Sequence, residues 1–337
     1  MRTELLTPTD EAVARAGALL RAGEVVGFPT ETVYGLGANA LDASAVDKIF
    51  AAKGRPGDNP LIVHIADADA LAPLIRGEPS AAARALMDAF WPGPMTLIFP
   101  RSGRVPLRVT AGLDTVAVRM PSHAVARALI RAAGVPVAAP SANRSGRPSP
   151  TTARDVLEDM DGRVPLILDG GACGVGVEST VIDLTGGCAR VLRPGGVTQA
   201  QIASIAGACE VDRAVLAPLG EGERPRSPGM KYRHYAPRGE VTVFRGPDAA
   251  EKIIRRYDAC EGALILALEG HVPLYGARRV LSLGADTRDM AANLFGALRE
   301  ADRLGAREIL CEGVEPTGVG LAVMNRLLRA AAFRVMD

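Results

Sequence analysis

Several common features are missing from this sequence, and each absence excludes a class of protein. Uncharged stretches are interrupted by glycine, proline or polar residues, and none approaches the roughly 18 apolar residues of a membrane-spanning helix. The first residues, MRTELLTPTDEAV, alternate charges with short apolar pairs and lack the hydrophobic segment of a signal peptide. We therefore expect a cytoplasmic protein without a membrane partner.

Cysteine is scarce and its spacing is uninformative. The five cysteines are odd in number, lie far apart, and form no CxxC or Cys/His pattern that suits zinc. We predict that they are reduced core residues and that the protein has no cysteine-based metal site; they are Cys173, Cys188, Cys209, Cys260 and Cys311.

An excess of charge of either sign is also absent. The 39 Lys and Arg residues against 38 Asp and Glu give a net charge of +1, so no global field recruits nucleic acid. Only Lys48, Lys53, Lys231 and Lys252 are lysines, so arginine is the default cation of this chain. A position that keeps lysine is one that needs a compact, mobile ammonium group.

The common catalytic signatures are missing as well. No GxxxxGK[ST], HExxH or GxSxG pattern occurs, which disfavours a P-loop NTPase, a zinc protease and an α/β-hydrolase. Gly35-Leu36-Gly37 only loosely resembles a dinucleotide-binding loop, and we interpret it as a closely packed turn.

What is present is a regular alternation of helices and strands. The pattern predicts helices at 10–22, 44–53, 81–90, 123–133 and 151–160, and strands at 60–66, 95–100, 116–121, 135–143, 164–171 and 179–184. Residues 24–38 read as strand, turn and strand. Several connections are too short for a helical crossover, so we expect an α/β architecture with a twisted mixed sheet.

The 337 residues suggest two domains. Proline and glycine dominate from about residue 207, and between 224 and 238 there are five cations, no acid, and the aromatic residues Tyr232, His234 and Tyr235. We expect a catalytic domain at 1–207, a basic and aromatic linker at 208–238, and a small Rossmann-like domain at 239–337, where strands and helices again alternate.

Polar residues gather at the ends of predicted strands and helices. Lys53 and Arg55 follow a helix; pairing with the helix dipole explains Lys53 well but explains Arg55, between glycine and proline, less well. A fixed Lys/Arg pair is what a triphosphate site without a P-loop uses. For His64 alone a satisfied core histidine is the expectation, and for Glu178 and Asp183 hydrogen bonding to local backbone.

Six motifs in one order carry a resemblance: Thr-Glu-Thr-Val-Tyr-Gly-Leu-Gly, Lys-Gly-Arg-Pro with Asn-Pro-Leu, Trp-Pro-Gly-Pro, Pro-Ser-Ala-Asn, Glu-Ser-Thr-Val and Leu-Arg-Pro-Gly. The chain resembles the YrdC/Sua5 family of L-threonylcarbamoyladenylate synthases. Residues 227–237, SPGMKYRHYAP, look like the interdomain segment of the longer, Sua5-type members. The resemblance covers essentially the whole chain.

This resemblance implies a nucleotidyltransferase that converts L-threonine, bicarbonate and ATP, with Mg2+, to threonylcarbamoyl-AMP and pyrophosphate. The product would pass to a downstream transferase that makes N6-threonylcarbamoyladenosine in tRNA, and no stable nucleic-acid binding would be required. Because a carbamoyl-adenylate hydrolyses readily, we expect the linker to close over the site.

The resemblance also implies a set of site residues. Lys53 and Arg55 would be catalytic and hold the triphosphate. L-Threonine would contact Thr32, His64, Arg119 and Ser179, with Arg119 as the partner of its carboxylate. ATP would contact Arg55, Asn59, Thr115, Ser141, Asn143, Ser149, Arg193, Tyr232 and Tyr235.

Three other interpretations compete with this one. A module that binds double-stranded RNA needs a basic surface, yet residues 1–207 carry twenty charges of each sign. Carbamoyl transfer as in hydrogenase-maturation proteins would bring zinc-finger and acylphosphatase segments, which this chain lacks. In a purely structural reading Lys53, Arg55 and Ser141 would be incidental.

Overall fold

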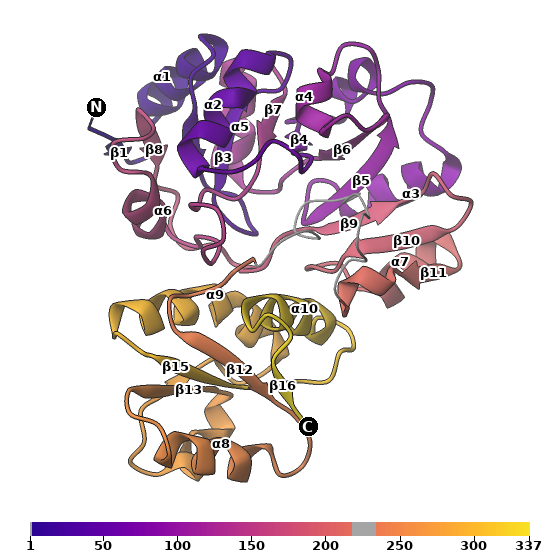
Figure 1. Cartoon of the computed structure of the whole chain (residues 1–337). Helices are drawn as coiled ribbons and strands as arrows, with labels where there is room; N and C mark the ends of the chain where they lie inside the picture. The colour runs from indigo at the N-terminus through magenta and orange to yellow at the C-terminus, as the bar shows by residue number, and fades with distance from the viewer. Residues whose placement is uncertain (1, 218–233) are drawn as a thin grey trace.

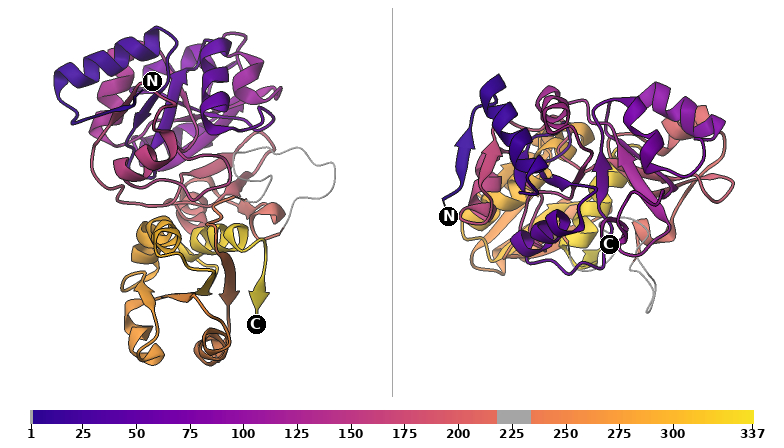
Figure 2. Two further views of the ribbon diagram at one scale, coloured as in Figure 1. Left: turned by 60° about the vertical axis from the view of Figure 1, so that its left-hand side comes forward. Right: turned by 90° about the horizontal axis from the view of Figure 1, so that it is seen from above.

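The computed structural model describes residues 2–217 and 234–337, and these residues form two stacked units (Figure 1). The larger unit is built on an eleven-stranded sheet and the smaller one on a five-stranded sheet, counted over the described residues. Figure 2 shows that the second unit lies against one side of the first, and that the two chain ends belong to different units. The predicted α/β class, with a mixed sheet and a smaller second domain, is confirmed.

The large sheet mixes parallel and antiparallel pairs, as the short connections predict. β4 and β6 run parallel, whereas β7 runs antiparallel to β4 and β5 antiparallel to β6. In spatial order the strands are β1 (Glu4–Leu6), β8 (Leu166–Leu168), β2 (Val26–Phe28), β3 (Gly35–Asn39), β7 (Val137–Ala139), β4 (Ile62–His64), β6 (Thr115–Arg119), β5 (Met95–Pro100), β9 (Thr180–Asp183), β10 (Ala189–Arg193) and β11 (Cys209–Val211).

The helices of this unit begin where the sequence provides capping groups. Thr9 caps α1 and Ser80 caps α3 through their hydroxyl oxygens, and Gly54 ends α2 in the left-handed conformation that glycine tolerates. The helices are α1 (Asp10–Arg21), α2 (Ala43–Lys53), α3 (Ala81–Phe90), α4 (Leu107–Thr110), α5 (Ala124–Ala133), α6 (Ala153–Met160) and α7 (Gln199–Ala206).

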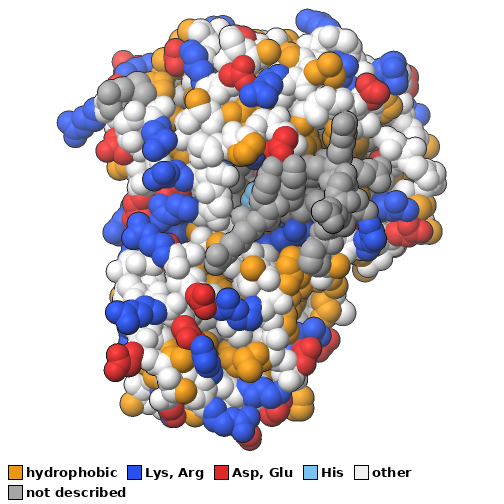
Figure 3. All heavy atoms as spheres, viewed as in Figure 1, with side chains coloured by type: hydrophobic (Ala, Val, Ile, Leu, Met, Phe, Trp, Pro, Cys, Tyr) orange, Lys and Arg blue, Asp and Glu red, His pale blue; other side chains and the backbone are white. Residues whose placement is uncertain are grey.

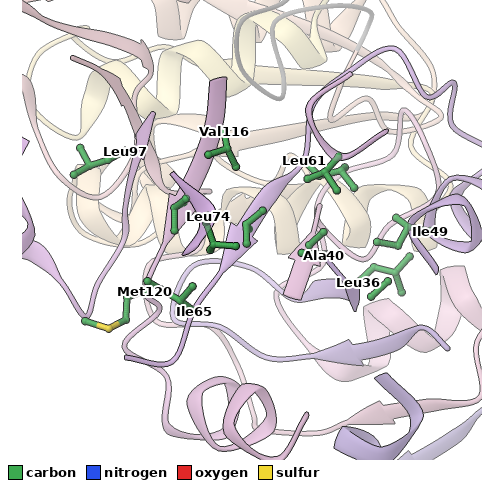
Figure 4. Close-up of a cluster of buried hydrophobic side chains, with 14 of the residues drawn as sticks. Leu36, Ala40, Ile49, Leu61, Ile65, Leu74, Leu97, Val116 and Met120 are labelled. Atoms are coloured by element: carbon green, nitrogen blue, oxygen red, sulfur yellow. The ribbon is translucent and has the colours of Figure 1, made fainter. Parts of the chain in front are cut away.

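One face of the large sheet is covered by the main hydrophobic core (Figure 4). Side chains of Leu61, Val116 and Leu97 come from or flank the central strands, and Ile49 from α2 packs into the same cluster. Alternate residues of these strands, Ile62, Ala117 and Ile98 among them, form a smaller apolar cluster. Because alternate strand residues point to opposite faces, the central strands are apolar on both sides.

The smaller unit has an all-parallel sheet with helices on its faces. Its strand order is β14 (Val280–Ser282), β13 (Ala263–Ala267), β15 (Glu308–Glu312), β12 (Glu240–Phe244) and β16 (Val335–Met336). The helices are α8 (Ala249–Asp258), α9 (Thr287–Arg303) and α10 (Gly320–Ala330). In Figure 1, α9 and α10 lie on the side of this sheet that faces the larger unit.

Two arginines of α9 join the two units, and one of them, Arg299, is buried. Arg299 pairs with Asp159 of α6 at 2.8 Å, and Arg303 pairs with Asp155 and Glu158 of the same helix. Every residue of α10 is buried, because this helix lies between its own sheet and the larger unit. Breaking a buried pair such as Arg299–Asp159 by removing one partner typically costs about 3–5 kcal/mol.

The first residues of the predicted linker pack with the larger unit. β11 pairs in parallel with β10, and a 3-10 turn, η3 (Arg213–Val215), follows it, so residues 209–215 pack with the larger unit. A three-residue strand is too short to show an alternating pattern. Tyr232 and most of the predicted linker lie outside the described residues.

The cysteines are all free, but only two of them are buried. Cys173 and Cys311 are core residues, whereas Cys188, Cys209 and Cys260 are partly exposed, so the prediction of five core cysteines was wrong for three. Among helices of the described chain, none is both long and apolar enough to cross a bilayer.

The core assignment predicts a large difference between two leucines. Leu97, on β5, is fully buried, whereas Leu107, at the start of α4, is 52% exposed. We expect Leu97→Ala to lower the free energy of unfolding by about 3 kcal/mol and Leu107→Ala to change it by less than about 0.5 kcal/mol. Urea unfolding followed by circular dichroism measures both, and equal effects would contradict this description of the core.

Candidate active site

A polar cavity lies over the second face of the large sheet. Ile62 and His64 both line it from β4, and Ala139, which pairs with Ile62, lines it from β7. Residues two apart on a strand share a face, so the cavity lies over the face of the sheet. The sequence had suggested a site at the ends of the strands, along the edge of the sheet. The lining residues are Thr30, Val33, Tyr34, Gly35, Arg55, Ile62, His64, Arg119, Ala139, Pro140, Ser141, Asn143, Glu178, Arg193, His234 and Tyr235.

Arg119 is buried at the end of β6 and is held on three sides. Its guanidinium donates to Thr32 Oγ1 at 2.9 Å, to Glu31 Oε1 at 2.6 Å and to the Gly93 carbonyl at 3.4 Å. Thr32 Oγ1 also lies 2.9 Å from Thr30 Oγ1. Glu31 was not among the predicted site residues, although it stands between the two threonines of the first motif. The structure thus brings together Thr32 and Arg119, two of the residues predicted to contact L-threonine.

His64 is adjacent to Arg119 and is kept neutral. The two residues are register partners on the parallel strands β4 and β6, so their side chains point to the same face. Burial and then the neighbouring Arg119 cation lower the pKa of His64 to about 3. Its Nδ1 lies 3.2 Å from the Ile62 carbonyl. His64 is therefore both buried, as expected for a core histidine, and a lining residue of the cavity.

The loop after β7 forms a second wall and is held by Lys53. The Lys53 ammonium donates to the Ser141 carbonyl, and to the carbonyl of Asn143 at 2.6 Å. Burial, followed by repulsion from Arg55, lowers the pKa of Lys53 well below its usual value. Ser141 and Asn143 line the cavity, whereas Lys53 lies behind them in the described chain.

Arg55 and Asn59 lie beside this loop. Arg55 lines the cavity and donates to the Asn59 carbonyl at 3.3 Å. Asn59 is 1% exposed, and neither polar atom of its side chain has a hydrogen-bond partner among the described residues. Buried amides normally have partners, so this amide has hydrogen-bonding capacity to spare, but it is not a lining residue of the cavity that the described residues form.

Arg193 closes the cavity from β10. It donates to the carbonyl of Ser179 at 3.1 Å and to its hydroxyl at 3.0 Å, and that hydroxyl lies 2.7 Å from Thr96 Oγ1. Burial is the main reason that the pKa of Arg193 falls to about 10, which still leaves it charged near neutral pH. Ser179 and Arg193, predicted for different substrates, are thus in direct contact.

Glu178 is the lining residue whose contacts the sequence did not indicate. The expectation of local backbone bonding was wrong, because the Glu178 carboxylate accepts from Ser149 Oγ at 2.6 Å and pairs with Arg326 of α10 at 2.8 Å. Burial raises its pKa, but Arg326, Arg193 and the Ser149 hydrogen bond outweigh that effect, so the pKa is below its usual value. For Asp183 the same expectation is confirmed, since its carboxylate accepts from the backbone of Thr185.

Two of the remaining predicted residues have different positions. Tyr235 lines the cavity, and its ring lies 5.1 Å from that of Phe295 of α9. Thr115 begins β6, four residues from Arg119, and pairs with Pro100; it is not a lining residue of the cavity that the described residues form. Thr30, Tyr34 and His234 line the cavity but were not predicted as site residues, although each lies within a segment that carried the resemblance.

The arrangement suits anionic, hydrogen-bonding ligands. Arg55, Arg119 and Arg193 reach one cavity from three separate segments, and hydroxyl, amide and neutral imidazole groups lie between them. Guanidinium groups bind carboxylates and phosphates through paired hydrogen bonds. In the described chain, no three His, Cys, Asp or Glu side chains are grouped to hold a metal ion.

Comparison with known proteins gives full-length similarity. The Sua5/YciO/YrdC family model, described as "Telomere recombination", matches residues 18–195, and the model of the threonylcarbamoyl-AMP synthase C-terminal domain matches residues 197–332. A Bacillus subtilis protein named threonylcarbamoyl-AMP synthase is 49% identical over 339 residues, which cover 99% of this chain and 97% of the relative. A Pyrococcus abyssi protein of the same name is 49% identical over 326 residues, with 95% and 94% coverage.

A solved structure agrees with this assignment. The crystal structure of Pyrococcus abyssi Sua5 complexed with L-threonine superposes with a TM-score of 0.92 at 46% identity, covering 99% of this chain and 98% of that one. The YciO structure from Escherichia coli covers 57% of the chain with a TM-score of 0.52. Both domain models and the full-length relatives lead to one conclusion: this chain belongs to the Sua5 family of threonylcarbamoyl-AMP synthases.

Proposed function

We propose that the cavity over the large sheet is where L-threonine, bicarbonate and ATP are converted to threonylcarbamoyl-AMP and pyrophosphate. The observation that carries the proposal is the convergence of Arg55, Arg119 and Arg193 on one cavity that also contains a neutral histidine. All three substrates bring negative charge, so a site for their reaction must offset their mutual repulsion. Family membership supports the same reaction.

We place L-threonine at the Arg119 end of the cavity. The Arg119 guanidinium already binds one carboxylate, that of Glu31, through Nη2, and a guanidinium is a suitable partner for the carboxylate of an amino acid. Thr32, His64 and Ser179 supply a hydroxyl, a neutral imidazole and a second hydroxyl for the polar groups of the substrate. A neutral His64 adds no further positive charge beside the threonine amine, which must lose its proton to react.

We place ATP toward the loop after β7 and the end of α2. Arg55 would contact the triphosphate, and the unpartnered Asn59 amide would gain a partner. Lys53 holds the Ser141–Asn143 loop from behind, so we assign it the function of a positioning residue. Arg193, Tyr235 and the predicted contacts Thr115, Ser149 and Tyr232 complete the proposed nucleotide set.

The reaction needs two bonds to form in sequence. The threonine amine attacks the carbon of bicarbonate or CO2 and gives a carbamate, with loss of water when bicarbonate reacts. A carbamate oxygen then attacks the α-phosphorus of ATP, and the bond from that phosphorus to the bridging oxygen breaks to release pyrophosphate. Alignment of two bound anions in one cavity makes this step effectively unimolecular.

Three further assignments complete the proposal. Mg2+ would enter with ATP, since this ion is usually held by phosphates, water and few protein ligands. The product would serve tRNA modification, through a transferase that takes up threonylcarbamoyl-AMP, in the cytoplasm. The division at 207 and 238 into catalytic domain, linker and second domain remains our proposal for the functional units.

The direct test is product formation by the purified full-length chain. With ATP, Mg2+, L-threonine and bicarbonate, mass spectrometry is expected to detect threonylcarbamoyl-AMP, together with an equal amount of pyrophosphate. Omitting threonine or bicarbonate should abolish both signals. ATP turnover that is independent of threonine would contradict the proposal.

Arg119 offers a test of the threonine end. Arg119→Gln is expected to raise the KM for threonine roughly 100-fold, because loss of a buried charged partner costs about 2–5 kcal/mol, and to change ATP affinity little. The matched control is Arg127→Gln, which removes an arginine that binds Asp67 and the Ala66 carbonyl on the surface of α5. Equal changes for both substrates would rule out a specific carboxylate contact.

The pH behaviour of His64 is a further prediction. Because its folded-state pKa is about 3 against an ordinary 6.5, the ring stays neutral in the folded protein while the unfolded chain takes up a proton. Its contribution to stability is therefore complete above about pH 6.5 and is lost as the pH falls toward about 3. NMR of the imidazole, assigned with His64→Gln, should show no titration from about pH 8 to pH 5; a midpoint near 6.5 would refute the burial argument.

A further inference from the structure

The segment before β9 belongs to the cavity but is held by the second unit. A Cβ added at Gly176 would lie 2.3 Å from the Ala292 Cα of α9, so the two backbones are in direct contact. Two residues later, Glu178 lines the cavity and pairs with Arg326 of α10. Helices α9 and α10 of the smaller unit therefore fix one wall of the site.

Arg326 is fully buried and binds this wall through most of its donors. Its Nε donates to Glu178 Oε2 at 2.8 Å, its Nη1 donates to the Pro194 carbonyl at 2.9 Å, and its Nη2 lies 3.4 Å from the Glu178 carbonyl. Asn325 Oδ1 accepts a further hydrogen bond at 2.8 Å. The Arg326 guanidinium also lies 5.6 Å from the centre of the Tyr235 ring.

Glu178 connects Arg326 to Ser149, a residue of the proposed nucleotide site. Its second oxygen accepts the hydrogen bond of Ser149, which is completely buried. Arg193 directly precedes Pro194, whose carbonyl Arg326 binds, and it holds Ser179, the neighbour of Glu178. One guanidinium of α10 is thus connected to Ser149 and Arg193 without touching the cavity itself.

The charges around Glu178 show why it depends on Arg326. Arg326 faces it from α10, Arg193 from β10, Lys53 from α2 and the Tyr235 phenol from the chain before β12. Burial alone disfavours the carboxylate, and Arg326 is the strongest opposing influence. Without Arg326, the buried Glu178 carboxylate would lose its Nε donor and the Glu178 carbonyl would lose its Nη2 donor. Losing donors to buried acceptors costs more than losing an exposed ion pair.

We propose that Arg326 is a positioning residue for the nucleotide part of the active site, acting through Glu178 on Ser149 and Arg193. This inference rests on the proposed function for the identity of the ligand, and it gives the second domain a direct part in ATP binding. Residues that orient ligand-binding groups in this way typically affect affinity 10- to 100-fold, roughly.

The experiment compares Arg326→Met and Arg326→Lys in the full-length chain. Calorimetry with MgATP is expected to show roughly 10- to 100-fold weaker binding for Arg326→Met, and less weakening for Arg326→Lys, whose single ammonium cannot bind Glu178 and Pro194 together. The KM for threonine should change several-fold less than the KM for ATP. Circular dichroism identifies variants that fold, and Arg326→Lys provides the answer if Arg326→Met does not fold.

Arg303→Met is the matched control. Arg303 also joins the two units through α6, but it contacts none of the lining residues in the described chain. If Arg326 acts only by docking the units, the two variants will weaken ATP binding equally, which would overturn the proposal. Selective weakening in the Arg326 variants supports it.

A double-variant cycle and a pH profile test the path through Glu178. Combining Arg326→Met with Glu178→Gln removes the unpaired carboxylate, so it should restore part of the lost ATP affinity; strictly additive losses would contradict the path. In Arg326→Met alone the acid limb of kcat/KM for ATP should move to higher pH, because Glu178 then protonates more easily, and the double variant should lack this shift. Calorimetry measures ATP binding even if the wild-type chain forms no threonylcarbamoyl-AMP. Failure of the proposed function can therefore be distinguished from failure of the inference about Arg326.

Discussion

The site depends on guanidinium groups that are buried and must therefore be paired. Arg119, Arg193 and Arg326 are 3%, 7% and 0% exposed, a location in which an isolated charge would be very unfavourable. Each is satisfied by groups from distant segments: Arg119 by Glu31 and Thr32, Arg193 by Ser179, and Arg326 by Glu178. Because each buried guanidinium must keep its hydrogen-bond partners, these residues are held in place. Their positions determine the shape of the cavity.

The same pairing connects stability with binding. The sheet buries apolar side chains on one face and presents His64, Arg119 and Arg193 to the cavity on the other, which His234 and Tyr235 also line. On the face seen in Figure 3, Lys and Arg side chains are interspersed with Asp and Glu over both units. Arg55, Arg119 and Arg193 are gathered in one cavity, an arrangement that suits a small anionic ligand.

Local features of the fold could be read from the sequence, and long-range ones could not. The helical spacing of apolar residues at 10–22 indicated α1, and the apolar run of β5 indicated its strand, because these signals lie within a few residues. The family resemblance brought Thr32, His64, Arg119 and Ser141 into one proposed site. The pair of Glu178 and Arg326 spans 148 residues and two domains, and neither residue type reveals its partner. Strand β11 could not be predicted, because three residues are too few to show an alternation of polar and apolar side chains.

An experimental structure with L-threonine and a non-hydrolysable ATP analogue tests the central claim most directly, namely that buried arginines orient both substrates in one cavity. The account predicts the threonine carboxylate on the Arg119 guanidinium, the phosphates beside Arg55, and Glu178 still bound to Arg326 and Ser149. Threonine bound away from Arg119, or a nucleotide outside the cavity that Arg55 and Arg193 line, would contradict it.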